Sequence, residues 1–171
     1  MSSKKARTWV PTVTTAVAVA ALSVPLAAGV ANASPVTADV PAACSTVPVS
    51  DRAKPVVEFA CDMALKQVDV KQFSPEPNNP KVPAVNYFIA EAWNKAGVTL
   101  KGMKNIESFY GETMSTGTRK NHANAVPGDI VFIPTMKMAR GVYLGDNKIA
   151  GVKSGKIEII TGNATEAVEP V

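Results

Sequence analysis

The sequence holds one histidine, two cysteines and few aromatic residues, and these shortages exclude several kinds of chemistry. The histidine, His122, lies in a polar segment without a second imidazole. The carboxylates are scattered along the chain, so the ligand spacing of a metal site is missing. The glycine-rich loop that binds phosphates and the serine elbow of hydrolases are absent as well. We therefore expect no metal and no cofactor, and interpret His122 as a solvated loop residue.

The charge balance gives no sign of a nucleic-acid partner. The chain has 18 Lys and Arg against 14 Asp and Glu, a formal net charge of +4. Three of the basic residues, Lys4, Lys5 and Arg7, lie within residues 1–33, which contain no acidic residue. Without this segment the chain has 15 basic and 14 acidic side chains. The resulting net charge of +1 does not indicate a basic binding surface.

Residues 1–33 have the pattern of a secretory signal peptide. The basic start is followed by an apolar run from Ala16 to Val30, and Ala31-Asn32-Ala33 puts small residues where signal peptidases cleave. The run is shorter than the ~20 apolar residues of a membrane span, although a retained anchor is the alternative. We predict cleavage after Ala33 and a secreted single domain that has no contact with the membrane afterwards.

Both cysteines follow the signal segment, so they meet an oxidising compartment after export. Two cysteines allow one pairing, and we predict a disulfide between Cys44 and Cys61. A free reactive thiol is the alternative.

The segments after the signal predict helices first and strands later, the order of an α+β domain. Residues 34–51 are rich in Pro, Ala and Ser and suggest an extended lead-in. Apolar spacing predicts a helix over 53–68, with Ser50 or Asp51 as its cap, and a second helix that begins near Val85 and ends before Gly97.

Four prolines within residues 69–83 predict a loop without regular structure. A short helix is expected around Ile106 to Tyr110, and a polar loop over 111–126. Period-two patterns and turn residues predict an antiparallel sheet, and residues 162–171 are expected to form a loose, flexible tail. The strands are expected at 130–134, 140–144, 148–152 and 156–161.

Three stretches of this chain resemble the NlpC/P60 family of cell-wall peptidases. They are the helix from Ala84 to Leu100, the run Pro127-Gly128-Asp129-Ile130-Val131-Phe132 and the run Gly141-Val142-Tyr143-Leu144-Gly145. The resemblance covers roughly residues 52–161. It implies a papain-like fold, with N-terminal helices packed on a C-terminal antiparallel β-sheet, and an ancestry in the hydrolysis of peptidoglycan stem peptides.

The catalytic positions that the resemblance implies are vacated. Where the family opens its helix with Asp-Cys-Ser-Gly, this chain has Ala84, Val85, Asn86 and Tyr87. The histidine position is Ala139 and the position of the third polar group, twelve residues on, is Gly151. A thiol needs a base and an orienting group, so the loss of all three predicts a pseudoenzyme. If the three positions converge on one open cleft, the interpretation as a pseudoenzyme stands, and if they are scattered, the family assignment fails.

Asn86, Tyr87 and Arg140 are the candidate ligand-binding residues. Asn86 and Tyr87 open the central helix, where free amides favour anionic or carbonyl groups. Arg140 follows the vacated histidine position, and its side chain faces either the cleft or solvent, because a shift of one residue reverses the face. Asp129 is expected to bond nearby backbone amides, and Trp93 and Tyr143 to pack in the core.

Four lysines make the strand region basic, and a solvated sheet edge explains them as well as an acidic wall polymer does. They are Lys137, Lys148, Lys153 and Lys156.

The sequence thus predicts a secreted, non-catalytic domain that binds peptidoglycan or its stem peptides at the bacterial cell envelope. A protein-binding regulator of an active cell-wall hydrolase is the second hypothesis, since a fold does not determine its function. A peptidase with relocated catalytic residues is a remote third.

Overall fold

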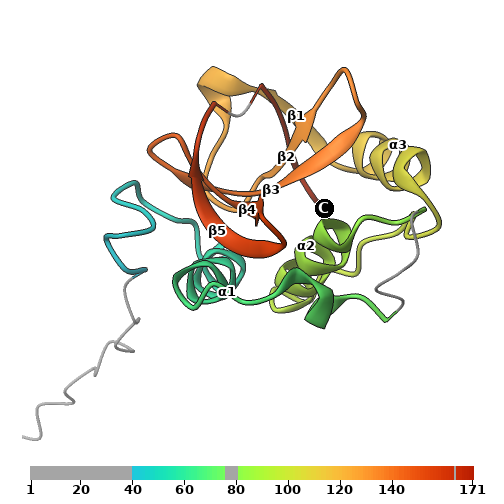
Figure 1. The fold of residues 1–171 in the computed structure, drawn as a ribbon. Helices are drawn as coiled ribbons and strands as arrows, with labels where there is room; N and C mark the ends of the chain where they lie inside the picture. Colours follow the sequence, from blue (N-terminus) through green and yellow to red (C-terminus); the bar gives the residue numbers. More distant parts are fainter. Residues whose placement is uncertain (1–39, 76–80, 164) are drawn as a thin grey trace, which may run out of the picture. The chain divides into compact units, whose positions relative to one another are not determined.

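The computed structural model describes residues 40–75, 81–163 and 165–171, which form an α+β unit (Figure 1). The predicted signal peptide lies outside these residues, and within them no helix has the length and hydropathy of a membrane span. The helices are α1 (Lys54–Leu65), α2 (Ala84–Asn94) and α3 (Ile106–Thr116), with the 3-10 turns η1 (Val70–Phe73) and η2 (His122–Asn124). The strands are β1 (Thr118–Asn121), β2 (Ile130–Ile133), β3 (Met138–Gly145), β4 (Lys148–Lys153), β5 (Lys156–Thr161) and β6 (Glu166–Glu169).

The six strands form one antiparallel sheet in the order β1-β6-β2-β3-β4-β5. The predicted strands match β2 to β5 within two residues at each end. The turns between β3, β4 and β5 place Asp146, Asn147 and Ser154 at positive φ, as turn residues of antiparallel hairpins do. Helices α1 and α2 lie side by side beneath the sheet in Figure 1, and α3 lies at the right-hand side of the sheet.

Helix α2 is the best-predicted element of the chain. Its apolar side chains recur every three to four residues, and this stripe is buried against the sheet. Gly97 has a φ of 75°, and the amide of Val98 donates to the carbonyl of Trp93 at 3.1 Å, so the helix ends in a Schellman motif. The buried residues of the helix are Val85, Asn86, Phe88, Ile89, Ala92 and Trp93.

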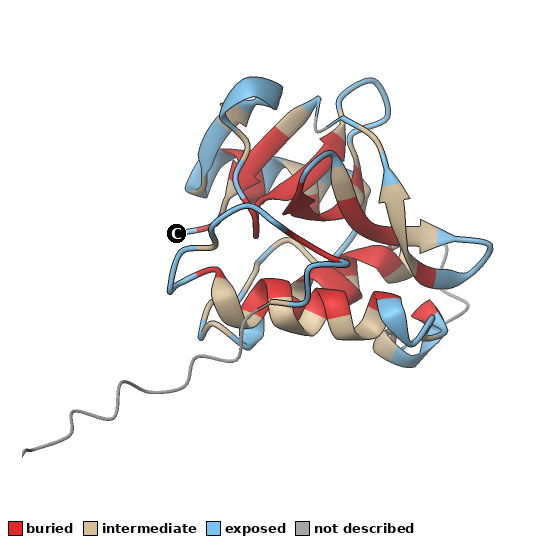
Figure 2. Cartoon of the chain, turned by 90° about the vertical axis from the view of Figure 1, so that its left-hand side faces the viewer, coloured by how far each residue is buried: buried red, intermediate tan, exposed pale blue. Residues whose placement is uncertain are grey.

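The main hydrophobic core lies between the helices and one face of the sheet, where buried residues concentrate in Figure 2. Trp93 is 1 % exposed, which confirms the expected packing role. A smaller cluster, which includes Tyr143, occupies the opposite face of the sheet. Gly128, before β2, packs closely against Ala53, before α1. A Cβ at position 128 would lie 2.7 Å from the Cβ of Ala53, and the φ of 101° also favours glycine.

The structure corrects two details of the N-terminal half. Helix α1 begins at Lys54 with Ala53 in the cap position, and the Ser50 hydroxyl accepts from the amide of Ala53 in the turn before it. The loop expected over 69–83 contains η1. The Asp69 carboxylate accepts from the amide of Lys71 at 2.9 Å, and the turn ends before the first proline, which explains why proline density did not prevent it.

The polar loop expected over 111–126 is wrong. Helix α3 continues to Thr116, and β1 and η2 follow it. Asn105 caps the helix by accepting from the amide of Ser108 at 2.7 Å, and Phe109 and Met114 are buried on its inner side. Gly111 and the many hydroxyl side chains lower the intrinsic helix propensity of this stretch, so packing decides its conformation.

The loose tail expected over 162–171 is also wrong, because Glu166–Glu169 form β6. This strand lies between β1 and β2 and pairs with both. Ala167 and Val168 are fully buried on opposite faces of the sheet, one in each hydrophobic cluster. Four residues with two charges resemble a tail in sequence, and only the distant partner strands make them a strand.

The disulfide predicted between Cys44 and Cys61 is present, and it fixes the segment before α1. Both cysteines are fully buried. Next to them, the Thr46 amide and hydroxyl donate to the Asp146 carboxylate at 2.9 and 2.6 Å, and these bonds lower the pKa of Asp146. The lead-in is thereby attached to α1 and to the turn between β3 and β4.

We expect the paired substitution Cys44→Ala and Cys61→Ala to lower the free energy of unfolding by about 3 kcal/mol. The bond closes a loop with a sequence separation of 17 residues, and opening it restores entropy to the unfolded chain. Urea denaturation followed by circular dichroism measures the change. Reductant should destabilise the wild type and leave the paired variant unchanged, and an equal effect on both would contradict the assignment.

Candidate functional site

The two positions at which the resemblance predicts a vacated nucleophile and base lie in the hydrophobic core. Val85, in the first turn of α2, is 8 % exposed and Ala139, on β3, is 6 % exposed. Both belong to the cluster between the helices and the sheet. Neither side chain lines any of three hollows of the described chain, which have volumes of about 550, 100 and 350 Å³.

The third position, Gly151, lies on the other face of the sheet. Its neighbours Ala150 and Val152 pack toward the helices, and side chains alternate along a strand. A Cβ at Gly151 would lie 2.6 Å from the carbonyl oxygen of Arg140, so a side chain cannot be added without moving the backbone.

A bulge in β3 explains why Ala139 and Gly151 face apart. Gly141 pairs with Val131 and Ala139 pairs with Phe132, which leaves Arg140 as the extra residue. The bulge reverses the alternation and turns Ala139 toward α2. The expected arrangement of three positions around one cleft is therefore wrong for Gly151.

The largest described hollow is a groove of about 550 Å³ along the outer side of α2. Its walls come from α1, η1, α2 and the segment after α2, which places residues from four parts of the sequence around it. Aromatic rings and Leu100 supply the apolar lining, and amide, hydroxyl and carboxyl groups supply the polar lining. The groove is lined by Phe59, Gln72, Phe73, Tyr87, Ala90, Glu91, Asn94, Thr99 and Leu100.

Two consecutive candidates, Asn86 and Tyr87, point to different sides of α2. Asn86 is 2 % exposed, and its Oδ1 has no hydrogen-bond partner among the described residues. Tyr87 is half-buried and lines the groove together with Glu91 and Asn94. These three residues are spaced by four and three positions, the second stripe of a helix whose first stripe is buried.

Arg140 lies away from the groove. A Cβ at Gly162 would lie 2.5 Å from its guanidinium, which donates a long bond of 3.5 Å to the carbonyl of Asn163. Both contacts belong to the connection from β5 to β6. The sequence left open whether the Arg140 side chain faces the cleft or solvent. In the structure it packs against the connection from β5 to β6, and it does not line the groove.

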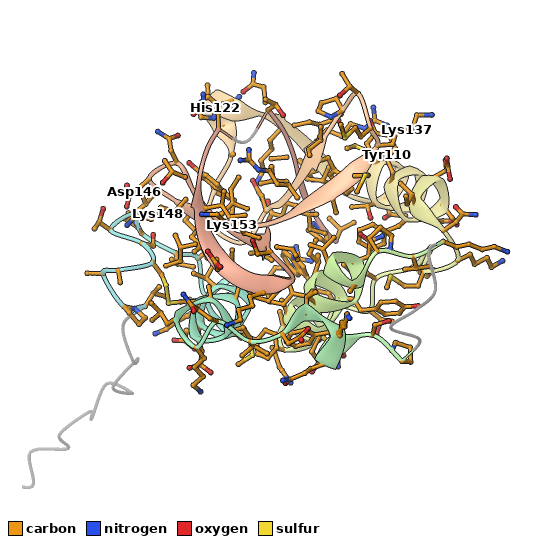
Figure 3. The ribbon with its side chains drawn as sticks, viewed as in Figure 1. Tyr110, His122, Lys137, Asp146, Lys148 and Lys153 are labelled. Carbon is orange, nitrogen blue, oxygen red and sulfur yellow. A yellow bond between two sulfur atoms is a disulfide. The ribbon has the colours of Figure 1, made fainter. Side chains whose placement is uncertain are left out.

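Lys137 lies apart from Lys148 and Lys153 in Figure 3, and Lys153 and Lys156 are register partners on β4 and β5. Lys137 lies at the upper right of Figure 3, at the turn between β2 and β3, and Lys148 lies at the left. The Lys148 ammonium donates to the carbonyl of Ala43 at 3.2 Å, and Lys156 starts the edge strand β5. This arrangement favours the interpretation as solvated edge residues.

His122 is exposed in η2 at the top of Figure 3, away from α1 and α2. Among the described residues no group of three His, Cys, Asp or Glu side chains could hold a metal ion. A second, smaller cavity of about 100 Å³ lies between α3 and the segment after α2, and the buried Thr113 hydroxyl beside it lacks a described partner.

Asp129 is the most buried charged group, at 1 % exposure. As predicted it bonds a nearby amide, that of Val126 at 2.9 Å, and it also accepts from the Lys120 ammonium at 3.1 Å. Burial raises the pKa of Asp129, and the bonds from Val126 and Lys120 oppose that rise. Burial also disfavours the charged form of Lys120, but its bonds to Glu169 and Asp129 outweigh this and raise its pKa. The ammonium thus joins β1, β6 and the turn before β2.

Comparisons of the chain with protein-family models, curated proteins and solved structures find no match.

Sequence reasoning identified Tyr87 but missed the rest of the groove. The signal within α2 was readable, because Tyr87, Glu91 and Asn94 form a polar stripe opposite the apolar one. The contributions of Phe59, Phe73 and Leu100 were not, since they depend on how distant segments pack.

We expect Lys120→Met to lower the free energy of unfolding by on the order of 3 kcal/mol at pH 7, because Asp129 would stay buried without a cation. A carboxyl whose folded pKa exceeds its unfolded value loses stability as pH rises through that interval. The difference in free energy of unfolding between the wild type and Lys120→Met should therefore become smaller from pH 7 to pH 4, as Asp129 becomes neutral. Guanidinium denaturation at both pH values measures it.

The matched control is Lys153→Met, which removes an exposed lysine from β4. It should change stability by less than about 0.5 kcal/mol at either pH. A Lys120→Met deficit that is constant with pH would contradict the role given to Asp129.

Proposed function

We propose that this chain is a secreted, non-catalytic domain with a papain-like fold of the NlpC/P60 type, and that it binds peptidoglycan or its stem peptides at the bacterial cell envelope. The motifs of α2, β2 and β3 suggest the family. The packing of α2 against β3 supports it, because the helix with the vacated nucleophile position lies beside the strand with the vacated base position.

The absence of catalysis is supported by the state of those positions. Val85 and Ala139 are buried aliphatic side chains, and position 151 has no room for a Cβ. Peptide hydrolysis by this family's chemistry needs a thiolate, a base and an orienting group within hydrogen-bond reach. No other described residue supplies them, because both cysteines form the disulfide and His122 is remote.

The single observation that carries the binding proposal is the groove along the outer side of α2. Its lining combines three aromatic rings with four polar side chains, the composition of a small-ligand or peptide site. Tyr87, a candidate from the sequence, lies in it. The proposed binding site thus lies on the side of α2 that faces away from the buried Val85.

Regulation of a cell-wall hydrolase through protein contact is the second candidate. An exposed apolar patch would favour it. The exposed large apolar residues of the described chain come from five separate segments. They are Val47, Leu65, Val126, Met136 and Val171.

We expect Tyr87→Ala to weaken co-sedimentation with purified peptidoglycan by about tenfold in apparent Kd. The ring is an aromatic anchor in the groove, and removing such anchors costs at least ~1.4 kcal/mol. Met136→Ala is the control, since it removes a 62 % exposed side chain outside the groove and should leave binding unchanged.

Wild-type protein that stays in the supernatant at low salt would make the peptidoglycan proposal wrong. Retention of a protein partner from an envelope extract in the same experiment would favour the regulator.

We further expect Val85→Cys to release no peptide fragments from peptidoglycan. The new thiol would face Ala139, which cannot accept its proton, and Gly151 cannot orient a base. Mass spectrometry of the soluble fraction after incubation is the measurement. Turnover by this single variant would show that the vacated positions have been assigned incorrectly, and the wild-type protein serves as the blank.

A further inference from the structure

We propose that the free edge of β5 pairs with β5 of a second copy of this chain, in an antiparallel register centred on Ile160. The two copies are then related by a two-fold axis, and their sheets become continuous across the contact. This surface is separate from the groove along α2, and the inference does not depend on the proposed function.

The backbone of β5 gives the first argument. β5 is the last strand of the sheet and pairs with β4 on one side (Figure 1). On its other side only the start is covered, where the amide of Ile157 donates to the carbonyl of Val68 at 2.8 Å. Backbone groups alternate between the two sides of a strand, so those of Ile159 and Thr161 point to the same side as those of Ile157. Among the described residues neither Ile159 nor Thr161 has a backbone bond on that side.

The side chains of β5 give the second argument. Ile159 and Ile160 are half-buried and lie on opposite faces of the strand, so the edge is apolar on both faces. The opposite edge of the sheet, β1, contains no apolar residue, and its exposed Arg119 is the kind of side chain that discourages strand pairing. An uncovered edge rich in β-branched apolar residues is instead a template for another strand.

The covered start of β5 determines the register of the pair. Because the amide of Ile157 is already bonded within the chain, Ile159 and Thr161 remain to exchange backbone bonds with a second strand. An antiparallel pair that uses both residues of each copy places Ile159 opposite Thr161 of the second copy. Ile160 then lies opposite Ile160 of the second copy.

Charge complementarity supports a second copy as the partner. In this register Glu158 lies opposite Gly162 of the second copy, and opposite residues point to the same face of a sheet. The Arg140 guanidinium lies on that face, 2.5 Å from where a Cβ of Gly162 would be. Glu158 and Arg140 are half-buried, and neither forms an ion pair among the described residues. The two-fold axis therefore places a Glu158–Arg140 pair on each side of the isoleucine contact.

The expected dimer is weak, because a contact along so short an edge belongs to the class that buries less than about 1,200 Å² in total. We therefore expect monomers and dimers in equilibrium, which analytical ultracentrifugation of the purified protein measures from micromolar to millimolar concentration. Protein that stays monomeric throughout would overturn the proposal, even if it captured an extended peptide from another protein.

Thr161→Pro tests the backbone pairing. Proline removes an amide hydrogen that the sheet of one copy does not use, and edge strands tolerate proline at such positions. We expect the dissociation constant of the dimer to rise by about tenfold, since a bond is lost on each side of the axis. Thr161→Val, the matched control, keeps the amide and should dimerise like the wild type. Equal dimerisation of the two variants would overturn the pairing.

Amide hydrogen exchange of the wild type tests the same pairing without a substitution. Exchange at Ile159 and Thr161 should become slower as the protein concentration rises. Exchange at Ile160, whose amide points to β4, should change little. The same exchange rates at all concentrations would contradict the pairing of this edge.

Exchange of the two charges tests the register. Glu158→Arg and Arg140→Glu should each weaken self-association by at least about tenfold, because each variant places like charges across the axis. An equimolar mixture of the two variants should dimerise like the wild type, since each copy then supplies the charge that the other lacks. A mixture that associates no better than either variant alone would overturn the register centred on Ile160.

Glu107→Arg is the control for charge reversal, because Glu107 is exposed in the first turn of α3, on another element. It should leave dimerisation unchanged. An equal loss of dimer in Glu107→Arg and Glu158→Arg would overturn the role given to Glu158.

Discussion

The burial of one face of α2 against the sheet determines most of what this molecule can do. Phe88, Ile89 and Trp93 are almost fully buried there, and each contributes roughly 2 kcal/mol through the apolar surface it removes from water. The same packing draws Val85 and Ala139 into the core, so the place where a nucleophile and a base would meet holds aliphatic side chains. The opposite side of α2, with Tyr87, Glu91 and Asn94, forms a wall of the groove. The buried side chains at positions 85 and 139 and the groove on the other side of α2 thus follow from the same packing.

The sheet depends on a second constraint, the insertion of β6 between β1 and β2. The Lys120 ammonium bonds both Asp129 and Glu169, and so connects the edge strand, the inserted strand and the turn that begins β2. The two partners differ in what sets their pKa. Burial raises the pKa of Asp129, whereas hydrogen bonds to two carboxylates raise the pKa of Lys120. The run Pro127-Gly128-Asp129 is therefore a structural motif in this chain, with a buried carboxylate that has a protein partner.

The bulge in β3 decides which way the side chains at positions 139 and 140 point. The bulge at Arg140 reverses the alternation of β3, turns Ala139 toward α2, and leaves Gly151 on the far face against the backbone of the neighbouring strand. A thiol, a base and an orienting group at positions 85, 139 and 151 would require a change of backbone as well as three side chains. Tyr87, Glu91 and Asn94 already line one groove.

The sequence by itself determined α2, the meander β2 to β5 and the disulfide. Each depends on a local period, on turn residues or on the single possible pairing of two cysteines. It also predicted that Asp129 bonds nearby backbone amides, and the bond from Val126 spans three residues. Only the tertiary structure decided that Glu166–Glu169 form a strand, that 111–116 continue a helix, that Arg140 lies against the β5–β6 connection, and that Phe59, Phe73 and Leu100 meet Tyr87. These outcomes depend on partners more than ten residues away or on a bulge of one residue, and a local pattern contains no information about either.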